Sequence, residues 1–575
     1  MQVARTERPG FGAALAAGGV VPFAVLLILH RLAPIPGISV ISPGGVVLSL
    51  LVGIGLVGGI ARHAGATIPN LGLAVAALLA IGGAGTTAAH VLPAASWDGQ
   101  TYHLPAVIWL MEGWQPLRSP PPVEGRAVLA AFFPSGIWTI QAGLGTLADN
   151  FEAGRSVNLL FGTAAAGAVG AWLTGPSLQR FDARAPVLVG ASVLLILNPV
   201  AVVQAPTAML DGAVYYLILL LTLALWRWLD RRDALAAATA LGAIVLLCNA
   251  KLAGLFFAVV IIVVVLAFHA VASHGRDVRA WLLGHGRVIG LLLAAGAVAT
   301  LGVGFRPYVT NLLDHGRLVY PPVTALVASQ VPEGVASQGH LGALVHLVFS
   351  ANADVGPGGP ARLRAPWEMA REAFFLDIDN RSGGFGPAFD LSVCLGALVL
   401  LGRFAASRRN PREAATGARI WDVLAVVALS CVVLFPRPWW ARFVPMAWVV
   451  PLALAGAAWT FKSGAGLRSL AAGILIAASV DTGVALDSAL ARLRDGIPVR
   501  PALRAAQACA EPVAISRGKI WSPSRNIGHV SHVVWQRRLA QAGIAATSVS
   551  RPQCPQGPHL TVDVHVCGPC GGRAQ

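Results

Sequence analysis

The sequence contains few charged residues. Asp, Glu, Lys and Arg together make up 12% of its 575 residues, whereas a soluble globular protein has about 25%. Hydrophobic residues make up 56%, and the mean hydropathy is +0.68. This scarcity of charge excludes an ordinary soluble enzyme and indicates a membrane protein. The formal net charge of +16 is therefore judged by its distribution among loops before nucleic-acid binding is considered.

Several functional motifs and processing signals are also missing. The chain has no nucleophilic serine motif, no Walker loop and no complete set of metal-ligating residues. It shows no internal repeat of the kind that many transporters carry. The first apolar run, residues 13–29, is followed by His30 and Arg31 instead of a small-residue cleavage site. We therefore expect a first membrane helix and not a cleaved signal peptide.

Long apolar runs dominate the sequence. About thirteen of them have 17 to 22 residues, which is enough to cross the ~30 Å hydrocarbon layer as a helix. The expected spans are residues 12–30, 42–61, 72–92, 156–174, 186–205, 209–228, 235–251, 253–271, 287–304, 386–403, 420–436, 441–460 and 467–486. The predicted fold is an all-α polytopic membrane protein.

Basic residues separate the loops into two sets. One set carries Arg62, Arg180, Arg184, Arg227, Arg231, Arg232, Arg276, Arg279, Arg287, Arg403, Arg408, Arg409, Arg412, Arg419, Lys462 and Arg468. The short loops of the other set carry only Arg31, Lys251, Arg437 and Arg442. Because positively charged loops stay in the cytoplasm, we expect a cytoplasmic N-terminus and, with an odd number of spans, a periplasmic C-terminus.

One further apolar segment, residues 128–147, does not fit this alternation. Counting it as a span would reverse every later loop and place the arginine clusters outside. Its Pro134, Ser135 and Gly136 also weaken a straight helix, although proline alone is tolerated in membrane helices. We expect a surface or re-entrant helix here.

This topology predicts three parts of the chain. Residues 1–70 form two extra N-terminal helices, and residues 71–486 form the main membrane module, with periplasmic loops near 93–155 and 305–385. Residues 487–575 form a small periplasmic C-terminal region.

The cysteines fall into two groups. Cys248, Cys394 and Cys431 lie in apolar runs and are expected to pack as small hydrophobic side chains. Cys509, Cys554, Cys567 and Cys570 lie in the C-terminal region, in the compartment where disulfides persist. Two disulfides are expected, with three possible pairings. The CxxC spacing of Cys567 and Cys570 leaves a redox motif or half a zinc site open as alternatives.

The stretch SWDGQTYHLP, residues 96–105, follows the third apolar run. It places Asp98 just outside the hydrocarbon layer, beside Trp97, Tyr102 and His103. A carboxylate at this depth is typical of a functional site. The alternative is a loop aspartate that ends the helix by bonding to the backbone.

Two more ionisable residues are expected at the same face of the membrane. Asp211 begins the sixth span among apolar neighbours and needs a cation, water or a substrate if it is ionised. Lys251 lies between the seventh and eighth spans. The alternatives are a carboxylate stabilised by the helix dipole for Asp211 and a lysine that reaches the interface for Lys251.

Four arginines add positive charge on this outer side. They are Arg306, Arg381, Arg437 and Arg442, the last two in the turn FPRPWWARFVP. Arginines in so short an outer turn indicate an anionic partner, and guanidinium groups pair in a bidentate way with phosphate. An aromatic belt with interfacial arginines is the alternative.

Together these residues suit the transfer of a group from a lipid phosphate. A carboxylate would take the proton of the acceptor, while cations would neutralise the charge that grows on the departing phosphate.

The same stretches resemble the GT-C superfamily of polytopic glycosyltransferases. SWDGQTYHLP, the prolines at 120–122, Asp211, Lys251, RPYVTN, GRLVYP, NRSGGFGP and WWARFVP are similar to patterns of its bacterial mannosyltransferase-like and aminoarabinose transferase-like branches. The resemblance covers about residues 70–460. It implies that Asp98 is the catalytic base or a group that orients the acceptor, and that Asp211 and Lys251 bind acceptor or lipid phosphate. Where some branches have a second acidic residue, Gly99 follows Asp98, so no metal or other cofactor is expected.

The sequence therefore predicts an inverting glycosyltransferase of a bacterial inner membrane. It would transfer a sugar from a polyprenyl-phosphate donor to a periplasmic acceptor. Asp98 would be catalytic, and the residues expected to bind donor or acceptor are Tyr102, His103, Asp211, Lys251, Arg306, Arg381, Arg437 and Arg442. Two alternatives are a transporter or flippase for a lipid-linked saccharide and a polymerase or ligase of surface polysaccharide.

Overall fold

The computed structural model describes most of the chain. The described residues are 10–32, 41–94, 96, 98–122, 129–174, 184–274, 277–320, 331–351, 361–365, 367–368, 376, 378, 384–409, 419–460, 464–495, 503, 507, 513–516, 531–549, 559–561 and 564–567. Arg381 and three of the four C-terminal cysteines (Cys509, Cys554 and Cys570) lie outside them.

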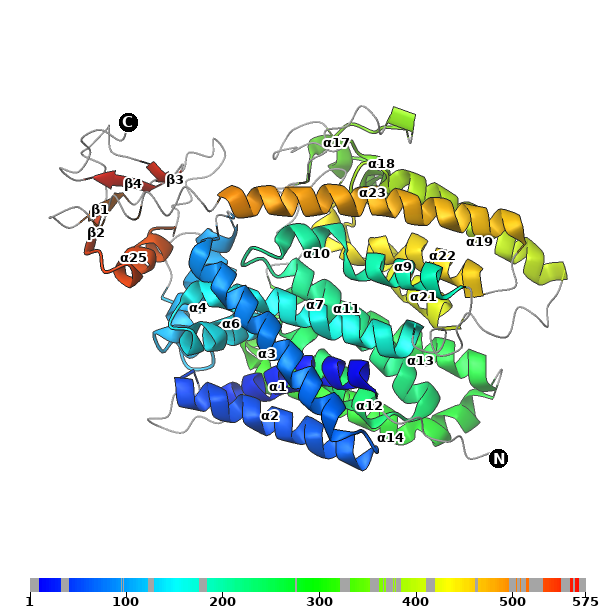
Figure 1. The fold of residues 1–575 in the computed structure, drawn as a ribbon, viewed down its shortest axis with the longest axis horizontal. Helices are drawn as coiled ribbons and strands as arrows, with labels where there is room; N and C mark the ends of the chain where they lie inside the picture. The colour runs from blue at the N-terminus through cyan, green and yellow to red at the C-terminus, as the bar shows by residue number, and fades with distance from the viewer. Residues whose placement is uncertain are drawn as a thin grey trace.

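Long helices form the body of the molecule (Figure 1). They are α1 (Phe11–Leu32), α2 (Pro43–His63), α3 (Ile68–Val91), α7 (Ser156–Ala168), α9 (Ala185–Ile196), α11 (Asp211–Arg231), α12 (Ala234–Cys248), α13 (Leu252–His274), α14 (Val278–Ala297), α19 (Phe389–Arg409), α21 (Arg419–Leu434), α22 (Val449–Thr460) and α23 (Ala465–Asp495).

Shorter helical pieces connect the long helices and extend some of them. They are η1 (Gly99–His103), α4 (Leu104–Met111), α5 (Leu129–Phe132), α6 (Gly136–Leu147), η3 (Phe151–Arg155), η4 (Val169–Thr174), α10 (Pro199–Gln204), η5 (Val298–Val303), η6 (Phe305–Val309), α15 (Thr310–His315), α17 (Glu333–Ala336), α18 (Gly339–Phe349), η8 (Ala441–Phe443) and η9 (Pro445–Trp448).

Nine helices in the described part of the chain are long and apolar enough to cross a membrane. The multi-pass membrane architecture expected from the sequence is thereby confirmed. Each of the thirteen expected segments contains a helix, but some of these helices are shorter than a membrane span. Helices α9 and α22 have 12 residues each, α12 has 15 and α21 has 16. The count of thirteen spans stays a prediction.

Helix α11 occupies the centre of the bundle. Of its apolar stretch 94% is buried inside the protein, compared with 11% for α3, which indicates that α3 lies at the lipid-facing periphery. Side-chain caps fix the helix starts on either side of α11. Asn198 accepts from the backbone nitrogens of Val200 and Ala201 at the start of α10, and Asp233 does the same for Leu235 and Ala236 at the start of α12. These caps define where the chain turns at each end of α11.

The segment at 128–147 is not one straight helix. It consists of α5 and α6, which are separated by the non-helical residues 133–135. Ser135 accepts a hydrogen bond from Arg31, and the Gly136 nitrogen donates to the Asn249 oxygen at 2.9 Å. Most of α6 is buried, so this segment is an interrupted helix within the protein and not a surface helix.

The C-terminal region adds strands that the all-α expectation did not include. The strands β1 (Val513–Ser516), β2 (Ala546–Val549), β3 (His559–Thr561) and β4 (Val564–Cys567) form one sheet in the order β2-β1-β4-β3. The β1–β2 pair is parallel and the other two pairs are antiparallel. Helix α25 (Ser531–Gln541) joins β1 to β2 and lies beside α4 at one end of the bundle (Figure 1).

Candidate functional site

Asp98 lies at the start of η1, a short π-helical turn that leads into α4. Its side chain is 16% exposed. The hydroxyl of Tyr102, four residues later, donates a hydrogen bond to Asp98 Oδ2 at 3.2 Å. A Cβ atom at Gly99 would lie 2.2 Å from Ser96 Oγ, so a larger residue at this position would require the Ser96 hydroxyl to move. The local sequence therefore aims Asp98 into the protein instead of into solvent.

Asp211 is the first residue of α11 and is buried. Gln204, from the end of α10, donates from Nε2 to Asp211 Oδ2 at 3.1 Å. The same Gln204 accepts from the Gly212 nitrogen at 3.3 Å. These bonds fix the carboxylate at the end of the central helix.

Lys251 lies in the short turn between α12 and α13. Its Nζ is 2.5 Å from Asp211 Oδ1 and 4.9 Å from the centre of the Phe443 ring. The lysine is therefore held inside the protein by an ion pair and an aromatic face, and it does not simply extend to the membrane interface.

Arg442, in η8, connects the two aspartates. Its Nη2 donates to Asp98 Oδ2 at 2.8 Å, and its Nε is 3.5 Å from Asp211 Oδ2. Its guanidinium carbon lies 4.7 Å from the centre of the Trp440 ring. Arg442 is 6% exposed, so its planar group is fixed by two carboxylates and one aromatic side chain.

Lys251, Asp211, Arg442 and Asp98 thus form a continuous series of opposite charges, which we call the charge chain. Two carboxylates offset two cations within it. Removing one member of a buried ion pair leaves an uncompensated charge and typically costs about 3–5 kcal/mol. The four residues therefore support one another, and an anionic ligand would have to compete with the carboxylates for Lys251 and Arg442.

Two of the other expected arginines, Arg306 and Arg437, do not join the charge chain in the part of the molecule that the structure describes. Arg306 lies in η6 and Arg437 precedes η8, and both are half-buried. Within the part of the chain that the structure describes, no ion pair involves either residue. Arg381 lies outside the described residues.

Tyr102 and His103 are buried beside the charge chain, with ring centres 4.1 Å apart. Burial and then the negative charge of Asp98 raise the pKa of Tyr102 well above its usual value, so the hydroxyl keeps its proton. Trp138 Nε1 donates to His103 Nδ1 at 2.8 Å. Burial lowers the pKa of His103 to about 3. His103 is therefore neutral at physiological pH and is committed to Trp138 through Nδ1.

We expect His103 to make the protein acid-sensitive. Its folded pKa of about 3 lies below the ordinary value of 6.5, so the unfolded chain binds the proton first and stability falls as pH drops from 6.5 towards 3. The charged neighbours of His103 are Asp98, Lys251, Asp211 and Arg442. The expected slope from this one group is about 1.4 kcal/mol per pH unit.

Thermal unfolding of the detergent-solubilised protein between pH 7 and pH 5 measures this effect. His103→Gln retains an acceptor for Trp138 but cannot titrate, so its melting temperature should fall less than that of the wild type. Equal losses in the two proteins would contradict the assignment.

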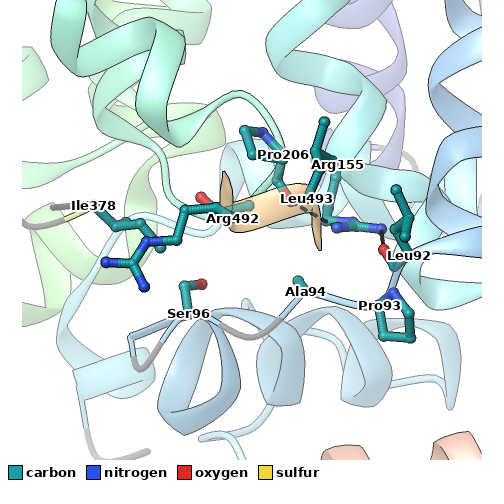
Figure 2. Close-up of a pocket in the computed structure, with 10 residues that line it drawn as sticks. Leu92, Pro93, Ala94, Ser96, Arg155, Pro206, Ile378, Arg492 and Leu493 are labelled. Atoms are coloured by element: carbon teal, nitrogen blue, oxygen red, sulfur yellow. Dashed lines mark hydrogen bonds between the residues drawn. The ribbon is translucent and has the colours of Figure 1, made fainter. Parts of the chain in front are cut away.

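A small cavity borders the segments that carry both aspartates (Figure 2). Its lining includes Ser96, two residues before Asp98, and Pro206 and Thr207, which precede Asp211. Figure 2 shows Arg155 and Arg492 at opposite ends of this cavity. Arg155 donates to the oxygens of Pro206 and Leu92 at 2.6 and 2.5 Å. It therefore holds the end of α3 against the residues that precede α11.

Sequence reasoning did not single out several polar residues of this region. Gln204 is the one polar side chain of the run PVAVVQ. A single polar residue in an apolar run could have indicated a residue of the site. Glu152 precedes Arg155 by three residues and pairs with it at 3.3 Å. A second buried pair, Arg364 and Asp390, is separated by 3.2 Å, while Asp481 accepts from the Ala388 nitrogen at 2.7 Å. No sequence motif identified these last three residues.

The described residues contain no group of three or more His, Cys, Asp or Glu side chains arranged to hold a metal ion. Cys248, Cys394 and Cys431 are free thiols, and Cys248 and Cys431 are buried. The chain was compared with protein-family models, curated proteins and solved structures, and none of them matches it.

Proposed function

We propose that the chain is a membrane glycosyltransferase of the GT-C kind. In this proposal it transfers a sugar from a polyprenyl-phosphate donor to a hydroxyl or amine of an acceptor outside the cytoplasm. The observation that carries the proposal is the charge chain, in which Arg442 contacts both Asp98 and Asp211 while Lys251 pairs with Asp211.

The two cations are suited to a phosphate ligand. The donor phosphate would replace a carboxylate as the partner of Arg442 and Lys251, since guanidinium and ammonium groups both bind phosphate oxygens. Movement of Arg442 to the phosphate would remove a nearby positive charge from Asp98 and so raise the affinity of its carboxylate for a proton. Arg306 and Arg437 remain candidates for contacts to the lipid headgroup at the same outer face.

The proposed step forms one bond and breaks one bond. The acceptor oxygen or nitrogen attacks the anomeric carbon, and the bond from that carbon to the phosphate oxygen breaks. Asp98 takes the proton of the acceptor. The polyprenyl phosphate leaves with the bonding electron pair, and its growing negative charge is stabilised by Arg442 and Lys251. Attack opposite the leaving group inverts the configuration of the anomeric carbon.

The proposed location is a bacterial inner membrane with the charge chain at the periplasmic side. The distribution of arginines among loops supports a cytoplasmic N-terminus and a periplasmic C-terminus. This orientation would bring the acceptor to Asp98 from the periplasm.

A reconstituted transfer assay tests the proposed function. Vesicles that contain the purified protein receive polyprenyl-phosphate donors with a labelled sugar, drawn from a panel of sugars. A transferase releases free polyprenyl phosphate and moves the label to an acceptor or to water. Movement of intact donor between leaflets without cleavage would contradict the proposal and support a flippase.

Lys251→Ala is expected to weaken donor binding. Loss of one charge-assisted contact to phosphate should raise the donor KM by about ten- to a hundredfold, with a smaller effect on kcat. Arg231→Gln is a control, because Arg231 is 52% exposed and pairs with the neighbouring Asp230 at 3.0 Å. An unchanged donor KM in Lys251→Ala would exclude Lys251 from phosphate binding.

A further inference from the structure

The C-terminal region contacts the segment that carries Asp98. Trp535 and Arg538 of α25 are 0% and 6% exposed, although α25 lies more than 400 residues beyond Asp98 in the sequence. Neighbouring Arg537 is 35% exposed in its side chain and is 3.8 Å from Glu112. One face of α25 is therefore buried against η1 and α4.

Two donors of α25 converge on Gln100, which lies in η1 two residues after Asp98. Trp535 Nε1 donates to Gln100 Oε1 at 3.1 Å, and Arg538 Nη1 donates to the same oxygen at 3.2 Å. Gln100 is 8% exposed. Both contacts act on the turn that determines where the Asp98 carboxylate points.

Arg538 also holds the chain on the other side of Asp98. Its Nη2 donates to the Ala94 oxygen at 2.6 Å, and Glu152 Oε1 accepts from its Nε at 2.9 Å. Glu152 in turn accepts from the Ala94 nitrogen at 3.2 Å. A single guanidinium group therefore binds residues 94 and 100, on either side of Asp98.

We propose that Trp535 and Arg538 are positioning residues for Asp98. The C-terminal region, through α25, binds Ala94 and Gln100 on either side of Asp98 and thereby sets the direction of the Asp98 carboxylate. A buried arginine with a carboxylate, a carbonyl and an amide oxygen as acceptors fixes geometry more tightly than apolar docking alone. The catalytic part of this inference rests on the proposed function, whereas the structural part does not.

The test combines exchange of backbone hydrogens with transfer kinetics in the full-length protein. Arg538→Gln removes the charge, and Trp535→Phe removes the donor to Gln100 while keeping a smaller aromatic ring beside Arg538. Arg537→Gln is the matched control, one residue away on the same helix, where the side chain is 35% exposed and pairs with Glu112 instead of with residues 94 and 100.

We expect Arg538→Gln to speed hydrogen exchange across residues 98–104 by about tenfold or more. It should lower kcat for transfer by a similar factor and leave the donor KM nearly unchanged, since Arg442 and Lys251 are not altered. Trp535→Phe should act in the same direction with a smaller effect. Arg537→Gln should match the wild type in both measurements.

The two measurements separate this inference from the proposed function. Faster exchange in Arg538→Gln together with a wild-type protein that cleaves no donor would support positioning of the Asp98 segment and contradict the glycosyltransferase proposal. Unchanged exchange and unchanged kcat in a folded Arg538→Gln protein would overturn the positioning role. A higher donor KM with unchanged kcat would also overturn it.

Discussion

Arg442→Gln is expected to reduce sugar transfer by about 10²–10³-fold. Arg442 is the only member of the charge chain that contacts both aspartates, at 2.8 Å for Asp98 and 3.5 Å for Asp211. The substitution removes the group proposed to stabilise the departing phosphate. It also breaks the ion pair between Arg442 and Asp98, which is expected to destabilise the fold by about 3–5 kcal/mol. Transfer rate and thermal stability of the purified variant measure the two effects.

A second variant separates catalysis from folding. Arg442→Lys keeps the positive charge but loses the planar group that reaches both carboxylates, so it should fold while transfer stays strongly reduced. Arg403→Gln is the control. Arg403 pairs with Asp422 at 2.7 Å. Asp422 lies near the first residue of α21, whereas Arg442 follows the last residue of this helix. Full transfer activity in Arg442→Lys would contradict the bridging role.

Asp98→Asn is expected to lower kcat by about 10²–10⁴-fold, the usual contribution of a general base. The asparagine has the same size, and its carbonyl oxygen still accepts from Tyr102 and Arg442, so the fold should be retained. Donor binding should be retained or become tighter, because Lys251 and Arg442 remain while one carboxylate that competes for Arg442 is neutralised. Steady-state transfer kinetics measure both quantities.

The control for this substitution is Asp422→Asn. It makes the same chemical change in another arginine-paired aspartate, far from the charge chain, and should leave transfer unaffected. Equal activity of Asp98→Asn and wild type, with the variant correctly folded, would exclude Asp98 as the base.

Hydrophobicity and charge distribution were sufficient to predict the membrane helices and the grouping of three ionisable residues. Asp98, Asp211 and Lys251 each lie next to an apolar run whose place in the predicted order of spans is clear from the sequence. The ends of spans that the prediction places on the same side of the membrane lie on one face, so the proximity of these three residues could be anticipated. The structure shows that these residues are in direct contact. Lys251 pairs with Asp211, and Arg442 pairs with both Asp211 and Asp98.

Which arginine joins the aspartates could not be predicted. Arg437 and Arg442 belong to the same turn, but among the described ion pairs it is Arg442, in η8, that contacts the aspartates. That path depends on packing among distant helices and leaves no periodic pattern in the sequence. The helix break at residues 133–135 had a local signal in Pro134, whereas the burial of α6 depends on contacts with other helices.

The contact of the C-terminal region with the Asp98 segment also has no local signal. Trp535 and Arg538 occur in the polar segment SHVVWQRRLAQ, where they would be expected on an exposed helix face. Their burial depends on Gln100, Ala94 and Glu152, which are distant in sequence. Only the folded chain brings these donors and acceptors together.

A single-turnover experiment tests the central proposal most directly. Wild type and Asp98→Asn are each saturated with the same polyprenyl-phosphate sugar, and the release of free polyprenyl phosphate is followed after acceptor is added. We expect both proteins to bind the donor, Asp98→Asn at least as tightly as the wild type, and only the wild type to release polyprenyl phosphate rapidly. Release at the same rate from both proteins, or intact donor in the wild type across the whole panel of sugars and acceptors, would contradict it.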